Sequence, residues 1–422
     1  IERYLEAAVA QVRWNRVRPA LERELRTHLE EQTEAYLAEG MDEDAAETEA
    51  VRQMGDAETV GLALDAVHRP KRQTAILLFA GLAIALGMYL RAELIGSSYV
   101  FALASGVLAC GVLLVGYYLA YRRLSRYAWY IYGAVLVLGA LCAYQTGRWG
   151  IAAPRMLSIT VGDTSEYAAL LYPPAYALVV YALRGKKGGF WLSLAALTPF
   201  VPLLLWNRFG DLLPRVLFAA GAAAVLLNAI RMGLFRVKKN RARALVWVLL
   251  VLAIAGFFYQ DSQQYQNPSD WYFSPAGLRA WREIIQNYHK SSSTVSALLA
   301  RGTLTEATRL GVLSGTPAWV WLATLYAPQA VLLVILLVRT AKLQNPLGRL
   351  LCVPAGVSLA MQLTLGLLYQ AGVFPLSVPL PFISGNLYTA LDAALLGLAL
   401  STLRQSACPE SVPRRKQPDP AV

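Results

Sequence analysis

The sequence predicts an all-α protein, in which a small cytoplasmic helical bundle precedes a polytopic membrane domain of about ten transmembrane helices. Composition is the first reason. Hydrophobic residues make up 56% of the chain and charged residues 16%, which is far from an average soluble domain. Distribution is the second reason, because residues 1–72 are rich in charge whereas long apolar runs follow one another after Arg72.

Residues 1–72 show the pattern of about four short helices. Apolar side chains recur at helical spacing, and Pro19 suits a first helical position. Asp42 is placed to cap a third helix, and Asp56 is placed to cap a fourth. We therefore expect a compact domain that ends at a basic run just before the first apolar segment.

This N-terminal domain resembles a known module. The pattern from Arg13-Trp14 through His28-Leu29-Glu30 to Met54-Gly55-Asp56 is similar to the permease prefix domain. That domain precedes the membrane portion of many Gram-positive permeases and FtsW/RodA-like proteins. The resemblance implies a cytoplasmic module for regulation or interaction, and a generic solubilising bundle is the alternative.

Ten apolar runs follow the N-terminal domain. Most of them have the length that a helix needs to cross a hydrocarbon core of about 30 Å. They lie near residues 73–90, 99–121, 127–144, 165–183, 189–206, 213–231, 244–260, 318–338, 350–373 and 385–403. The membrane domain is therefore expected over residues 73–404.

The charges of the loops predict the orientation of the chain. Loops rich in Lys and Arg alternate with loops that are poor in both, and the basic set falls on the side of the N-terminal domain. The positive-inside rule then places both termini in the cytoplasm of a multi-pass cell-membrane protein. These loops explain the net charge of +12, so no nucleic-acid partner is expected.

Two further segments differ from the short loops. Residues 261–317 form a long polar extracytoplasmic loop, and loops of this length are usually functional or disordered. The tail 405–422 is rich in Pro and charge, which predicts disorder. The four cysteines and three histidines are scattered without metal-ligand spacing, so no metal or other cofactor is expected.

A Pro-rich stretch lies between the last two spans. Pro375, Pro379 and Pro381 cannot continue a helix, because proline lacks the N–H and clashes with the preceding turn. Non-helical backbone at membrane depth must be sheltered by protein or line a cavity. An ordinary turn between two spans is the alternative interpretation.

The stretch Pro379-Leu380-Pro381-Phe382-Ile383-Ser384 resembles the signature of the FtsW/RodA/SpoVE family, and the match stops at Ser384. Proteins of this family have ten spans with a large outer loop between spans seven and eight. They serve cell elongation, division and sporulation, and they polymerise lipid II, a lipid-linked cell-wall precursor, alongside a class B penicillin-binding protein. The resemblance implies peptidoglycan synthesis and cell-shape or cell-cycle functions, with Pro381 and Ser384 at the substrate.

A second stretch carries the same resemblance. Arg155, Ser165 and Glu166 match a family pattern before the fourth span, whereas the Trp, Pro and Lys of that pattern are replaced. The resemblance implies that these three residues bind substrate. A carboxylate at the mouth of a span is costly to bury without a partner, and Arg155 is the candidate partner of Glu166. The alternative is that Glu166 lies in water at the interface.

One departure from the family bears on catalysis. The family places an essential Asp at the start of the eighth span, where it is thought to act as a general base on the acceptor hydroxyl. Pro317 stands at that position, and proline can neither take a proton nor bind a metal. The catalytic residue is therefore unknown, with Glu306 as a weak candidate for a relocated base and Asp270 as a further one.

Asp392 is the one acidic residue predicted inside the last span. An ionisable side chain at membrane depth is costly unless it faces the bundle interior and finds a partner. We therefore expect it to face the interior, with Arg215 or Arg309 as its partner.

Two interpretations of function follow. The first is a divergent FtsW/RodA/SpoVE-like protein that lacks the catalytic Asp and binds lipid II, a penicillin-binding protein or membrane lipids in a regulatory role. If glycosyltransferase activity is retained, a divalent cation would be compatible with it. The second is a permease or membrane sensor regulated through the prefix domain. A groove open to lipid and lined by Arg155 and Glu166 would favour the first, and a closed midplane cavity between symmetric halves the second.

Overall fold

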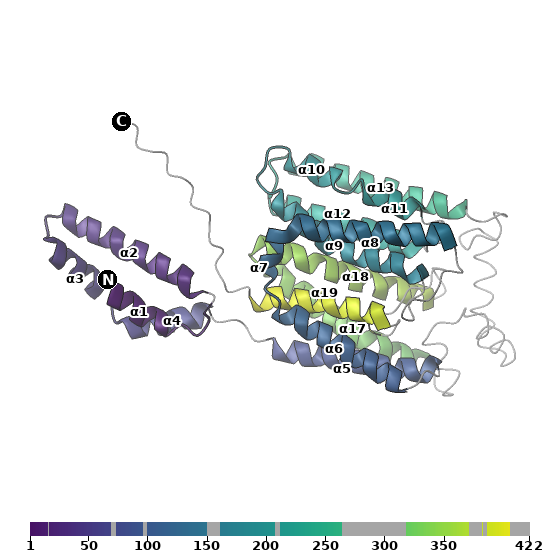
Figure 1. Ribbon diagram of the computed structural model, residues 1–422, viewed down its shortest axis with the longest axis horizontal. Coiled ribbons are helices and arrows are strands. Elements are labelled where there is room, and N and C mark those ends of the chain that lie inside the picture. The colour runs from purple at the N-terminus through teal and green to yellow at the C-terminus, as the bar shows by residue number, and fades with distance from the viewer. Residues whose placement is uncertain are drawn as a thin grey trace. The chain divides into compact units, whose positions relative to one another are not determined.

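The computed structural model describes residues 1–15, 17–68, 73–95, 99–149, 161–206, 212–263, 318–370, 382 and 386–405 (Figure 1). Every regular element in these ranges is a helix. The chain divides after Arg72 into two compact units. One contains residues 1–72 and the end of the chain from Arg404, and the other is Gln73–Leu403.

Four helices form the N-terminal unit, as the sequence predicts. They are α1 (Glu2–Ala10), α2 (Arg18–Ala38), α3 (Glu43–Met54) and α4 (Ala57–His68). The core of this unit contains Leu5 of α1, Leu25 and Leu29 of α2, and Ala50 of α3. The α1 and α4 backbones approach so closely that a Cβ on Gly61 would overlap a carbonyl oxygen of α1.

Of the two predicted side-chain caps of the N-terminal helices, the one at Asp56 is formed and the one at Asp42 is not. Asp56 precedes α4, and its Oδ2 accepts hydrogen bonds from the N–H of Thr59 at 2.9 Å and from the Thr59 hydroxyl at 2.8 Å. These bonds, the backbone bond first, hold the pKa of Asp56 below its ordinary value. Asp42 occupies the N-cap position of α3, but its side chain makes no capping hydrogen bond. Gly40 ends α2 with a φ of +92°, a conformation that favours glycine.

The second unit is a bundle of long helices. Its elements are α5 (Thr74–Ile95), α6 (Tyr99–Tyr118), α7 (Tyr121–Leu124), the 3-10 helix η1 (Ser125–Tyr127), α8 (Ala128–Trp149), α9 (Val161–Ala182), α10 (Gly189–Ala195), α11 (Phe200–Trp206), α12 (Leu212–Arg231), α13 (Lys239–Ser262), α17 (Ala318–Ala341), α18 (Pro346–Gln370) and α19 (Asn386–Arg404). Each of the ten predicted spans corresponds to one of these helices or, for the fifth span, to two. Among the described residues, five helical segments have the length and apolar composition to cross a membrane. The architecture is that of a polytopic helical membrane protein.

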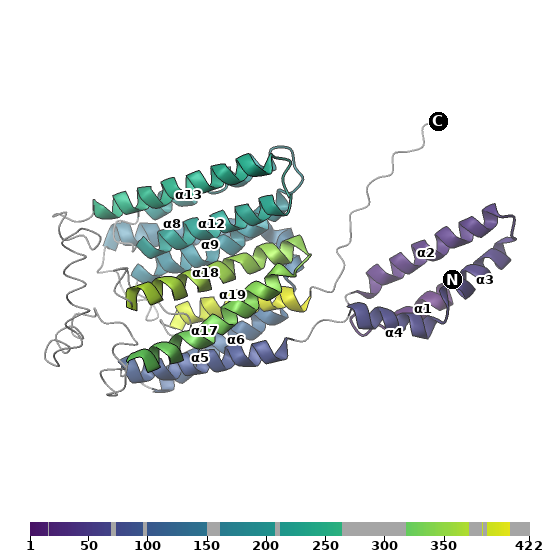
Figure 2. The same cartoon turned by 180° about the vertical axis from the view of Figure 1, so that it is seen from behind.

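Three helices occupy the centre of the bundle: α9, α12 and α18, which pack on one another. Nearly every side chain of α9 from Ala169 to Val180 is buried. Figures 1 and 2 show α13 along one edge of the unit, against α12, and α5 and α6 along the opposite edge. The outer faces of these edge helices carry exposed large apolar side chains, as lipid-facing helices do.

The fifth predicted span is two short helices, which corrects the expectation of one continuous helix over residues 189–206. The break between α10 and α11 contains Pro199, which has no N–H to continue the helical hydrogen bonds. The N–H of Phe200 donates to the carbonyl of Leu197 instead, so the chain tightens before α11 begins.

Tyrosine side chains from α8 and α9 satisfy the backbone near this break. The carbonyl oxygen of Ala196 accepts hydrogen bonds from the hydroxyls of Tyr132 and Tyr172, the latter at 2.7 Å. The hydroxyl of Tyr176 donates to the carbonyl oxygen of Ser193 at 2.8 Å. Within a membrane, an interrupted helix is tolerated only where neighbouring protein groups satisfy its backbone in this way.

Candidate functional site

The described part of the chain contains few of the predicted site residues. Ser165 and Glu166 lie in the first two turns of α9, and their side chains are outside the described set. The remaining predicted positions lie outside the described residues: Arg155, Asp270, Glu306, Arg309, Pro317, Pro381 and Ser384. The roles of these residues therefore stay predictions.

Phe382 is the one described residue of the Pro-rich stretch between α18 and α19. Its φ is +65°, a left-handed conformation that is rare for a large side chain and costs about 1–3 kcal/mol. Its side chain is only 2% exposed, and it borders a small cavity together with Leu336 of α17, Leu359 of α18 and Leu396 of α19. Burial of an aromatic ring is large enough to offset such strain.

Asp392 of α19 lines the same small cavity as Phe382. Its side chain faces the bundle interior, as predicted, and the residue is 7% exposed. The carboxylate accepts a hydrogen bond from Nε2 of Gln362 at 3.2 Å and another from the backbone N–H of Phe382. The same Nε2 donates to Oγ of Ser358 at 2.9 Å. Among the described residues, these polar groups are the partners of Asp392, and the predicted pairing with Arg215 is not observed.

This polar cluster holds Phe382 against the bundle. Oδ2 of Asp392 and Oε1 of Gln362 are buried, and neither has a hydrogen-bond partner among the described residues. The adjoining cavity has a volume of about 20 Å³, which is room for about one water molecule. Asp392 and Gln362 come from different helices, so the cluster also ties α18 to α19.

Sequence reasoning found Asp392 but missed Gln362 and Ser358. A signal was present, because these two residues are four apart in a largely apolar span, a spacing that places two polar side chains on one helix face. Within the described ranges, no group of three or more His, Cys, Asp or Glu side chains could hold a metal ion.

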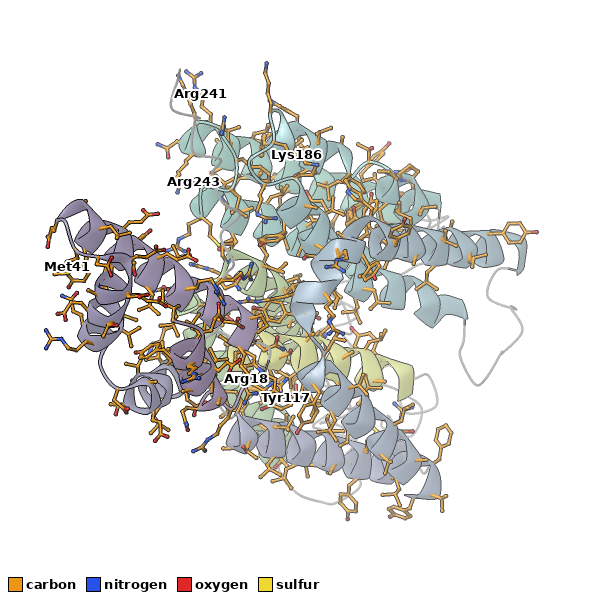
Figure 3. All side chains as sticks on the ribbon, turned by 60° about the vertical axis from the view of Figure 1, so that its left-hand side comes forward. Arg18, Met41, Tyr117, Lys186, Arg241 and Arg243 are labelled. Atoms are coloured by element: carbon orange, nitrogen blue, oxygen red, sulfur yellow. The ribbon has the colours of Figure 1, made fainter. Side chains whose placement is uncertain are left out.

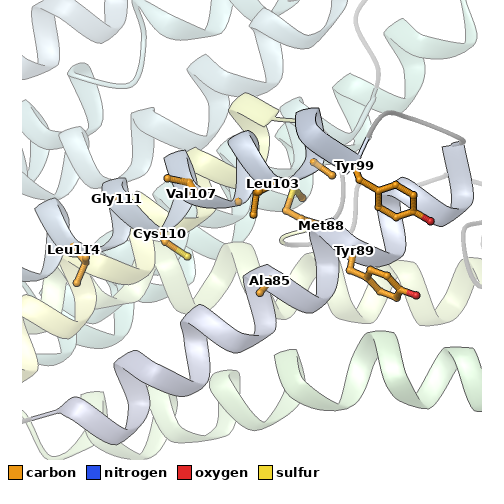
Figure 4. Close-up of a pocket in the computed structure, with 11 residues that line it drawn as sticks. Ala85, Met88, Tyr89, Tyr99, Leu103, Val107, Cys110, Gly111 and Leu114 are labelled. Carbon is orange, nitrogen blue, oxygen red and sulfur yellow. The ribbon is translucent and has the colours of Figure 1, made fainter.

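A second feature is an apolar groove between α5 and α6 (Figure 4). It has a volume of about 660 Å³ and is lined by apolar and small side chains, among them Met88, Leu103, Val107 and Cys110. Several of the lining side chains are exposed, so the groove opens on the outer face of the bundle. Its residues belong to α5 and α6 alone, so the predicted lining by Arg155 and Glu166 remains untested.

No family model and no curated protein matches the sequence. Among solved structures, the fold is similar to that of a chain from a peptidoglycan synthase complex, solved to explain the structural coordination of polymerization and crosslinking. The TM-score is 0.51 at 19% identity, and the match covers 79% of this chain and 98% of that chain.

The rod shape-determining protein RodA of Thermus thermophilus also matches. Its TM-score is 0.46 at 18% identity, over 80% of this chain and 97% of RodA. A variant of the same RodA gives a TM-score of 0.45 at 18% identity, over 80% of this chain and 98% of that chain. The chain from the peptidoglycan synthase complex, with its TM-score of 0.51, is the match that shows the shared fold.

Proposed function

We propose that this chain is a divergent FtsW/RodA/SpoVE-like membrane protein that serves peptidoglycan synthesis in cell division, cell shape or sporulation. One observation carries the proposal. The fold match covers nearly the whole of a chain from a peptidoglycan synthase complex, and the family-like Pro379–Ser384 stretch lies between the last two helices of that fold. Fold alone does not define function, so the stretch is the more specific part of the argument.

The proposed role is binding or regulation rather than polymerisation. Pro317 replaces the general base that the family resemblance leads us to expect, and proline cannot accept a proton. Glu306 is the first substitute to test, because it is the carboxylate of the predicted loop nearest to Pro317 in sequence, and Asp270 is the second. A class B penicillin-binding protein is the proposed protein partner, in keeping with the synthase complex to which the similar chain belongs.

The proposed ligand is lipid II, and two described features support it. The groove between α5 and α6 is apolar and open on the outer face of the bundle, which suits a long lipid chain. The strained Phe382, which is part of the family-like stretch, is held by a hydrogen bond from its N–H to Asp392. Arg155, Ser165 and Glu166 are the proposed contacts of the polar head group.

The N-terminal unit is proposed to be a cytoplasmic regulatory module of the permease prefix type. Its four helices fit that resemblance, and its charge differs from that of the rest of the chain. Residues 1–68 contain 16 Asp and Glu and 7 Arg, a net of −9, so the remaining 32 Lys and Arg and 11 Asp and Glu give +21. Both termini are proposed to lie in the cytoplasm.

Lipid II binding and polymerisation by the purified protein, alone and with a class B penicillin-binding protein, test the proposal. Glu283→Ala is a control in the same predicted loop. If glycan strands are no longer formed with Glu306→Ala but are still formed with Glu283→Ala, Glu306 acts as a relocated base. Binding of lipid II without strands would support the regulatory role. Loss of that binding with Val107→Trp, which fills the groove, but not with Val115→Trp would assign the groove. No binding by any variant would favour the permease or sensor.

A further inference from the structure

Two loops at one end of the membrane unit form a single basic surface. They are the turn from α9 to α10 and the turn from α12 to α13. The N–H of Gly185 in the first donates to the carbonyl oxygen of Leu234 in the second at 3.0 Å, and the rings of Phe190 and Phe235 meet edge to face at 5.8 Å. Figure 3 shows Lys186, Arg241 and Arg243 projecting from these loops and from the start of α13.

Nine exposed cationic side chains gather on this surface: Arg184, Lys186, Lys187, Arg231, Arg236, Lys238, Lys239, Arg241 and Arg243. In the described part of the chain, none of them forms an ion pair with a carboxylate. The sequence between Arg184 and Arg243 contains a single acidic residue, Asp211, which directly precedes α12 in the chain. Within the described residues of the membrane unit, no carboxylate therefore neutralises this positive charge.

An apolar groove begins directly beside this basic surface. It has a volume of about 440 Å³ and lies between α10, α11, α12 and α13. Trp191 of α10 and Val246 of α13 line its basic end, four residues after Lys187 and three after Arg243. From Leu226 to Phe218 the groove follows α12 for about 12 Å, at 1.5 Å per residue.

Exposed tryptophans place the basic end of this groove at the membrane interface. Trp191 is 62% exposed and Trp247 is 55% exposed, and both lie within two turns of the cationic loops. Tryptophan favours the head-group level of a bilayer, because its ring is apolar and its N–H remains in a polar layer. The groove therefore extends from head-group level into the hydrocarbon region.

We infer that this groove and the basic surface form a binding site for an anionic glycerophospholipid. The phosphate would lie among Lys186, Lys187 and Lys239, and one acyl chain would lie in the groove. An unneutralised basic cluster at head-group level attracts anionic lipid, and the adjoining groove gives the acyl chain a defined place. A soluble anion has no acyl chain to place in the groove, and a neutral lipid has no net charge for the cations to attract. This inference goes beyond the proposed function and does not depend on it.

The test uses the full chain in nanodiscs of equimolar phosphatidylglycerol and phosphatidylcholine, with native mass spectrometry of the lipids that stay bound. We expect selective retention of phosphatidylglycerol. Lys186→Gln, Lys187→Gln and Lys239→Gln together should weaken that retention about a hundredfold, from roughly fivefold for each cation. The matched control is Arg339→Gln, Lys342→Gln and Arg349→Gln, which removes the same charge near the turn between α17 and α18 and should change retention little.

A second pair of variants tests the groove without changing charge. Ala253→Phe places a ring in the groove, and Ala255→Phe places the same ring on an exposed face of α13 that does not line it. We expect the first alone to lower phosphatidylglycerol retention. Equal retention of the two lipids by the unmodified chain would overturn the inference. The inference would also be overturned if the two triple Gln variants lost phosphatidylglycerol retention equally. The same holds if the two Phe variants retained phosphatidylglycerol equally.

Discussion

The hydrogen bonds at Asp392 lead to a prediction about how Phe382 is held. Asp392→Ala removes the acceptor of the Phe382 N–H and one of the two acceptors of Gln362 Nε2. Asp392→Asn keeps an acceptor oxygen in nearly the same place and removes the charge. The two variants therefore separate the hydrogen-bonding role of this side chain from its charge.

The structure indicates the size of the two effects. With Ala, the N–H of Phe382 loses its acceptor inside the bundle, whereas Gln362 Nε2 retains Ser358. An unsatisfied buried donor costs about 1–3 kcal/mol, so the free energy of unfolding should fall by about that amount. With Asn, the oxygen can still accept both bonds, and we expect a change below about 1 kcal/mol.

Denaturant unfolding in mixed micelles, followed by circular dichroism, measures these free energies. Limited proteolysis then compares the rate of cleavage between α18 and α19, which we expect to rise for Asp392→Ala and to stay unchanged for Asp392→Asn. Thr389→Val is the control, since the buried Thr389 hydroxyl makes no hydrogen bond among the described residues. If Asp392→Asn lowers the free energy of unfolding as much as Asp392→Ala does, the negative charge of Asp392 itself contributes to stability. The explanation by hydrogen bonds alone is then refuted.

Three further predictions concern other parts of the chain. Tyr132→Phe and Tyr172→Phe should each lower the free energy of unfolding by about 0.5–1.5 kcal/mol in the same assay. The double variant should lower it by more than the sum, because the carbonyl of Ala196 at the break in the fifth span then has neither tyrosine donor. Gly61→Ala should loosen the N-terminal unit, seen as faster proteolysis of that unit, whereas Gly81→Ala, which meets open space, should not. The lowered pKa of Asp56 means that its capping contribution is present above its ordinary pKa of 3.8 and is lost as the pH falls through the lowered value. Thermal unfolding of the N-terminal unit should show that acid-dependent loss, and Asp56→Ala should remove it.

Local chemistry explains which parts of the fold could be predicted from the sequence. The ten spans could be predicted because a helix needs about 20 apolar residues to cross a membrane, and few other structures contain so long an apolar run. The cap at Asp56 could be predicted because capping depends on residues within a few positions of the helix start, whereas Asp42 occupies the predicted N-cap position without a side-chain hydrogen bond. The break of the fifth span was missed, although Pro199 was visible, because other helices of the bundle continue through proline.

The candidate site could be predicted only in part. Burial of Asp392 followed from the cost of an ionisable group in lipid. Its partners did not follow, because Gln362 and Phe382 come from other parts of the chain and are polar without being charged. The prediction considered only cationic partners and therefore named Arg215 or Arg309.

The sequence by itself determined the class of protein, the division after Arg72, the helices and the uneven placement of charge. These properties depend on composition and on spacing over a few residues, which folding cannot alter. Only the tertiary structure decided which distant groups lie together. It brings Phe382 to Asp392, places two tyrosines at the break between α10 and α11, and sets a basic surface beside an apolar groove. The physical reason is that hydrogen bonds and grooves require groups within a few ångströms of each other, and only the packing of helices brings such groups together.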